Sequence, residues 1–166
     1  MMRRRAAGVP APVPVDIEVG DDQDDVAIDA GALAALAGAV LAAEGVYGPA
    51  ELTLTFVDET EMAELNARHM GEPGPTDVLA FPLDDPAEVR PAGMTALLGD
   101  VVVCPVVARR YATEHVRSTD HELALLVVHG VLHVLGHDHG EPDEAAVMRD
   151  HELRHLRAFV DPAFDR

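Results

Sequence analysis

Hydrophobic and polar residues along this chain follow two periods, one typical of strands and one typical of helices. Residues 51–57 alternate strictly between apolar and polar side chains and are rich in β-forming types, which predicts a strand with one buried face. Shorter segments at 15–19 and 77–81 predict two more strands, the first at a sheet edge. The apolar run 97–104 predicts a fourth, buried strand.

Five helices are expected between and after these strands, and most of them begin at a recognisable capping residue or proline. The helices are expected at about 29–44 (capped by Asp29), 58–68 (Asp58 with Glu61), 106–116, 120–135 and 143–159 (opened by Pro142). Strands interleaved with helices in this way predict an α+β fold. We expect a single domain, with a small mixed β-sheet of about four strands packed with about five α-helices.

The helix at 120–135 is apolar on nearly every side from Leu123 to Val128, which places it in the middle of the domain. Thr119 and Glu122 have the spacing of a capping box, and Gly136 can end the helix in the left-handed conformation. This helix is therefore predicted to be the central element of the fold.

The same helix carries the clearest chemistry of the chain. His129 and His133 are four residues apart and share a helical face, and a turn at Gly136 can bring His139 toward them. Three imidazoles that converge form a zinc site whose fourth position is left for water. We expect one Zn²⁺ per chain; the competing interpretation is a set of core histidines bonded to backbone carbonyls.

The spacing of these histidines is also that of the metzincin proteases, with one large difference. Gly130 occupies the position at which those proteases carry the glutamate that serves as general base. The replacement favours a metal-activated water over the usual peptidase machinery.

The full motif H-G-x-L-H-x-x-G-x-D-H closely resembles the signature of the YbeY family, the zinc-dependent endoribonucleases of bacterial ribosomal RNA maturation. Two further blocks are similar to that family: Leu98-Gly99-Asp100, and the segment 65–82 with its Thr76-Asp77-Val78-Leu79 core. The resemblance covers about residues 17–148. It implies cleavage of single-stranded RNA, maturation of the 3′ end of 16S rRNA, and ribosome quality control. It also implies the small ribosomal subunit and assembly proteins as partners.

The chain departs from the family pattern in the second block. Many members carry an arginine directly before the glycine, where this chain has Met70, and a serine where it has Ala80. We expect Arg68 to supply the cation for the substrate phosphate, the alternative being a solvated arginine at a helix end. Asp138, between two of the histidines, is a candidate proton acceptor. Asp100 has two possible roles: its carboxylate could orient one of the histidines, or it could accept hydrogen bonds from backbone amides.

Charge and composition bear on how the protein binds RNA and on the compartment in which it works. The formal net charge of −18 argues against tight binding of RNA along a basic surface, although bound zinc can make a cleft locally positive. Cys104 is the lone cysteine, which fits a reducing cytosol. No apolar run has the length of a membrane span. We expect a flexible arm at 1–14, the hydrolase domain at 15–160 and a C-terminal tail at 161–166.

Two other functions remain open at this stage. A metalloprotease-like hydrolase would fit the metzincin spacing. A non-catalytic, zinc-stabilised assembly factor would need a fourth ligand such as His137. A second motif, H-E-x-x-H at residues 151–155, lies on a helix with many charged residues and is interpreted as a solvated surface.

Overall fold

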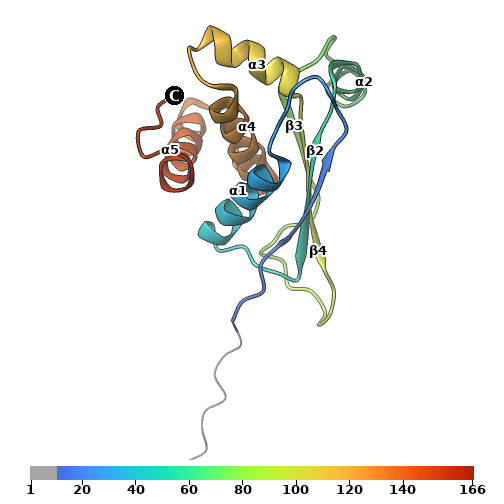
Figure 1. The fold of residues 1–166 in the computed structure, drawn as a ribbon. Coiled ribbons are helices and arrows are strands. Elements are labelled where there is room, and N and C mark those ends of the chain that lie inside the picture. Colours follow the sequence, from blue (N-terminus) through green and yellow to red (C-terminus); the bar gives the residue numbers. More distant parts are fainter. Residues whose placement is uncertain (1–10) are drawn as a thin grey trace, which may run out of the picture.

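A four-stranded mixed sheet organises the computed structural model, which describes residues 11–166 (Figure 1). The strands are β1 (Asp16–Asp21), β2 (Ala50–Phe56), β3 (Val78–Pro82) and β4 (Ala96–Val103), and they lie in the order β1-β2-β4-β3. Neighbours β1, β2 and β4 are parallel, whereas β3 runs antiparallel to β4. The predicted mixed sheet of four strands is confirmed, and β1 lies at an edge as expected.

Residues 11–166 form five helices. They are α1 (Ala30–Ala43), α2 (Glu59–Met70), α3 (Pro105–Glu114), α4 (Thr119–Val134) and α5 (Pro142–Phe159). Four of them pack on the sheet, while α5 packs on α4 and α1. Helices α1, α4 and α5 lie on one side of the sheet, and α2 lies on the other (Figure 1). Helix α4 packs against α1, α3, α5, β3 and β4, so the predicted central helix is confirmed.

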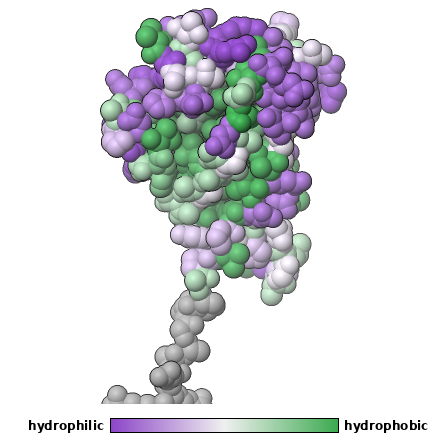
Figure 2. All heavy atoms as spheres, in the orientation of Figure 1, coloured by the Kyte–Doolittle hydropathy of each residue, from purple (hydrophilic) through white to green (hydrophobic). Residues whose placement is uncertain are grey.

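Alternate residues of β4 divide the core into two parts. Val101 belongs to the larger cluster with α1 and α4, while Val102 belongs to a smaller cluster with Met62 of α2. The period of two along a strand sends neighbouring side chains to opposite faces. Figure 2 shows an apolar area over α1, whose exposed residues are mainly alanine, and hydrophilic residues over the end that holds α2 and α3.

The helix caps agree with the sequence signals except at α4. Asp29 and Asp58 accept hydrogen bonds from backbone amides of the first turns of α1 and α2, as expected. At α4 the cap is Ser118, whose hydroxyl accepts from the His121 amide. The predicted capping box with Glu122 is therefore wrong: the Glu122 carboxylate is buried and receives a hydrogen bond of 2.6 Å from Arg117 instead.

Gly130 allows α4 to lie close to the sheet. A Cβ atom built at this position would stand 2.5 Å from Cγ1 of Val101, which is itself fully buried in β4. Real Cβ atoms do not approach another carbon this closely, so any side chain at residue 130 would push the helix and the strand apart.

The ends of the chain bear on the expected domain limits. The arm predicted at 1–14 falls largely outside the described residues; 11–14 have no regular secondary structure. Residues 161–166 pack on the domain: Phe164 is buried, and its carbonyl oxygen accepts a hydrogen bond of 2.9 Å from Arg157.

Between residues 11 and 166, no helix combines the length and the apolar character needed to cross a membrane.

The contact at Gly130 makes a prediction about stability. Gly130→Ala should destabilise the metal-free protein by about 1–3 kcal/mol, because overpacking outweighs the gain in helix propensity. Gly38→Ala, in the middle of α1 with its nearest neighbour at 3.9 Å, is the matched control and should be neutral or stabilising. Urea unfolding of both variants measures the difference; equal midpoints would contradict the packing argument.

Candidate metal centre

Three histidines meet at the C-terminal end of α4. His129 and His133 leave the same face of the helix one turn apart, and Gly136, with φ of 97°, turns the chain back so that His139 joins them. One nitrogen from each ring lies within 4.8 Å of the other two. The convergence expected from their spacing is therefore present, and the left-handed glycine that ends the helix produces it.

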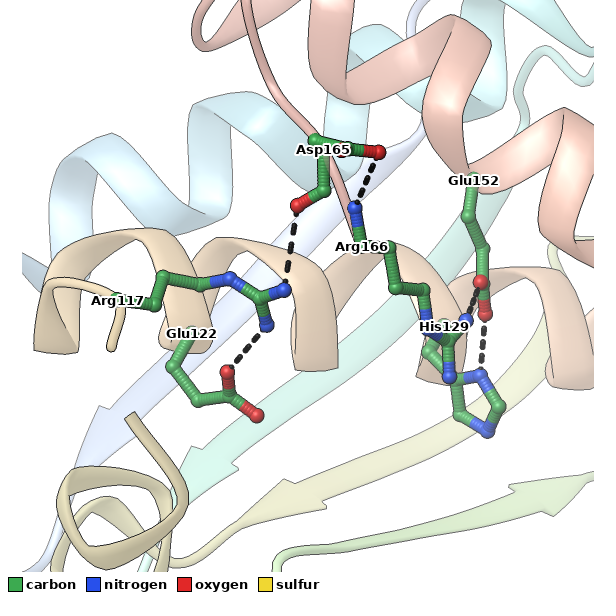
Figure 3. Close-up of polar contacts among 6 residues, drawn as sticks. All are labelled: Arg117, Glu122, His129, Glu152, Asp165 and Arg166. Carbon is green, nitrogen blue, oxygen red and sulfur yellow. Dashed lines mark hydrogen bonds and ion pairs between the residues drawn. The ribbon is translucent and has the colours of Figure 1, made fainter. Parts of the chain in front are cut away.

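A carboxylate from α5 fixes the orientation of one of these rings. Nδ1 of His129 lies 2.5 Å from Oε1 of Glu152 (Figure 3). With its Nδ1 hydrogen donated to this carboxylate, His129 presents the lone pair of Nε2 to the other two rings. Carboxylates that bond a ligating histidine in this way hold its tautomer and raise its basicity.

Glu152 has no exposed surface, so its charge depends on its neighbours. Its second oxygen, Oε2, forms an ion pair with Arg166 (Figure 3). Nearby, Arg117 joins Glu122 and the Asp165 carbonyl oxygen, so the last residues of the chain are tied to α4. These contacts place α5 and the C-terminal segment as support for the three-histidine site.

The environment of the site favours neutral imidazoles. Burial, assisted by the charge of Arg166, lowers the pKa of His129 to about 4. Burial and the two neighbouring imidazoles lower the pKa of His133 to about 4 as well. Neutral rings at neutral pH are the form that binds a metal ion. The donor set of three imidazole nitrogens therefore fits zinc.

A cavity of about 410 Å³ opens beside the three rings. Its wall is made by Met70, by residues 76–80 from β3 and the loop before it, and by Gly130. In the described part of the chain, no other histidine, cysteine or carboxylate joins the group of three. The site thus has three protein donors and an open side, the arrangement of catalytic zinc sites.

The other two residues predicted for the site, Asp138 and Arg68, are both exposed and differ in how close they lie to the three histidines. Asp138 is exposed and its Oδ1 accepts a hydrogen bond of 2.7 Å from the His139 amide, which lowers the pKa of its carboxyl. Arg68 is exposed on the last turn of α2, where it is absent from the cavity wall although Met70 is part of it. The roles of Arg68 and Asp138 stay predictions.

Asp100 does not orient a ligating histidine. It lies on β4 directly before Val101, which faces α4, so its own side chain points to the opposite face of the sheet. The partner of His129 comes from the H-E-x-x-H segment that the sequence suggested was a solvated surface. That interpretation is wrong, because Glu152 and His155 are buried. In the sequence, the glutamate of the H-E-x-x-H motif is the feature that could have indicated this partner of His129.

Loss of the Glu152 charge should weaken metal binding without emptying the site. Glu152→Gln is expected to reduce zinc affinity about 10- to 100-fold, the range seen for partners of ligating histidines. Asp150→Asn, an exposed change of the same charge on α5, should leave affinity unchanged. Competition with a chromophoric chelator measures both; equal affinities in the two variants would remove Glu152 from the metal centre.

Comparisons with known proteins agree with this geometry. A family model described as Endoribonuclease YbeY matches residues 18–160. A relative of that description from Beutenbergia cavernae is 46% identical over 144 residues, covering 84% of this chain and 94% of its own length. Another, from Salinispora tropica, is 48% identical and covers 80% and 88%.

A solution structure of a Thermotoga maritima protein has the same fold, with a TM-score of 0.55 at 24% identity, covering 90% of this chain and 97% of that one. The family model extends across most of the sheet, the three histidines and all of α5. The resemblance expected from the histidine motif is confirmed: the chain belongs to the YbeY family.

Proposed function

We propose that this chain is a zinc-dependent endoribonuclease that cleaves single-stranded RNA, and that it acts in maturation of the 3′ end of 16S rRNA and in ribosome quality control. The observation that carries the proposal is the group of three imidazoles with an open side on a cavity. The relatives bear the name endoribonuclease, which supports RNA as the substrate. The small ribosomal subunit and its assembly proteins are the proposed partners.

His129, His133 and His139 would hold the metal. Zinc bound there supplies a water whose pKa is lowered to about 7 and a positive charge that polarises a phosphoryl oxygen. Glu152 keeps the ring of His129 in place during the reaction. Because Gly130 has no side chain, the proton of the attacking water must go to a group outside the helix.

Asp138 is the proposed acceptor of that proton. Its carboxylate is exposed beside His139, whose backbone amide donates to Oδ1 and lowers the pKa of the carboxyl. The lowered pKa makes Asp138 a weaker base than an ordinary aspartate, so it would act only on a water of lowered pKa, such as zinc would supply.

The cation for the substrate phosphate is proposed to be Arg68. Arg68 is exposed on the last turn of α2, two residues before Met70 in the cavity wall. A bound strand that extends past the cavity would bring a phosphate to this guanidinium, which would stabilise charge that develops in the transition state. The net charge of −18 leaves few other cations for this work.

Two observations weigh against the alternative functions. A peptidase of the metzincin type needs a base at residue 130, where Val101 leaves no room for a side chain. A closed structural zinc site needs a fourth ligand, but the ring of His137 faces His151, 4.6 Å away between centroids, instead of the three histidines.

Cleavage of a short single-stranded RNA tests the proposal. Chelator should abolish cleavage and zinc should restore it. His129→Ala/His133→Ala protein, purified identically, should be inactive, because two of the three donors are gone. Equal cleavage by both proteins would reveal a contaminating nuclease. No cleavage by either would favour the assembly factor, and metal-dependent cleavage of unfolded casein would favour the peptidase.

A second experiment tests the phosphate contact. Arg68→Gln should lower kcat/KM for RNA about tenfold or more with unchanged zinc content, because only the transition-state cation is lost. Arg109→Gln, on the exposed surface of α3, is the control of equal charge. Met70→Arg, which places a cation in the cavity wall, should restore activity to the Arg68 variant. Equal activity of the two glutamine variants would exclude Arg68.

A further inference from the structure

A second group of metal-binding side chains lies apart from the three-histidine site. His151 and His155 are four residues apart on α5 and share a helical face, and Glu44 caps the C-terminal end of α1 opposite them. Oε1 of Glu44 lies 2.9 Å from Nδ1 of His151 and 2.6 Å from Nε2 of His155. One carboxylate oxygen and two ring nitrogens, from segments more than 100 residues apart, thus converge on one point.

Hydrogen bonds satisfy these atoms when no ion is bound. Nη2 of Arg154 and Oε1 of Glu44 both lie 2.9 Å from Nδ1 of His151, and Oε1 lies 2.6 Å from Nε2 of His155. A ring nitrogen that carries a hydrogen in one tautomer of histidine presents a lone pair in the other. A metal ion held by the three donors would replace these hydrogen bonds, and Arg154 would have to release Nδ1 of His151.

The surroundings suit a bound ion. The side chains of His155, Glu44 and His151 are 4%, 16% and 25% exposed, so the donors are shielded from water without being sealed off. A cavity of about 570 Å³ borders Glu44 and His137. The ring of His137 is 4.6 Å from that of His151. A further donor and a route from solvent are therefore both at hand.

We propose that Glu44, His151 and His155 form a second zinc site, with His137 or water in the fourth position. Two imidazoles and one carboxylate are a donor set that selects zinc over magnesium or calcium, which prefer oxygen ligands alone. The chain would then hold two zinc ions instead of the one expected from its sequence. This proposal does not depend on the proposed nuclease activity.

The second ion has a structural role. It joins the end of α1 to α5, and where His137 takes the fourth position it also joins the turn after α4. Helix α5 also carries Glu152, which lies between the two histidines in sequence and bonds His129 in the first site. The residues of the H-E-x-x-H segment thus serve two sites. Its two histidines would hold the second ion, and its glutamate orients His129 of the three-histidine site.

Metal content tests the proposal directly. Untagged protein is stripped with chelator, loaded with zinc, passed over a desalting column and assayed by elemental analysis. We expect two zinc ions per chain for the wild type, and one for His129→Ala/His133→Ala. Glu44→Gln and His151→Asn/His155→Gln should each retain one. His115→Asn, a change to an exposed histidine elsewhere, should retain two.

A single ion in the wild type would overturn the proposal, and so would two ions in the His151→Asn/His155→Gln variant. Thermal unfolding provides a readout that does not require the latter variant to fold. In the His129→Ala/His133→Ala background, added zinc should raise the midpoint, because an ion that binds only the folded chain stabilises it. Adding Glu44→Gln should abolish that rise; a rise of equal size would refute the site.

Discussion

The buried carboxylate of Glu152 is the constraint on which the arrangement of the three histidines depends. A charge without exposed surface is tolerated only where partners replace water, and Glu152 has two, His129 and Arg166. To satisfy both, α5 must lie along α4 in one register, and the C-terminal residues must return to the same point. The orientation of the His129 ring is therefore set by a contact between two helices.

The opposite side of α4 obeys a steric limit. Gly130 lets the helix approach β4 so closely that Val101 occupies the space of a side chain. The three imidazoles consequently stand over the sheet beside β3, whose residues form much of the cavity wall. Because this contact leaves no room for a side chain at residue 130, it excludes the glutamate that metzincin peptidases carry there. The same contact fixes how close the three histidines lie to the sheet.

Much of this arrangement could be predicted from local patterns. Period-two alternation located β2, capping residues located α1 and α2, and the spacing of His129 and His133 with Gly136 located the three histidines that converge. The wrong predictions concern residues whose surroundings are set by contacts between distant parts of the chain. Glu152 looked like a surface residue because its neighbours in sequence are charged, and its burial comes from α4, more than 20 residues earlier. Ser118 was passed over because Thr119 carries the same type of hydroxyl one residue later.

The parallel pairing of β2 with β4 has a consequence for the order in which the molecule forms. Paired residues of these strands are 46 or 47 positions apart in sequence, and pairings of this kind form slowly because a long loop must be ordered first. Until they pair, the apolar faces of α4 have no sheet to cover them. The wall of the histidine cavity, much of which comes from β3 beside β4, is therefore complete only after these strands have paired.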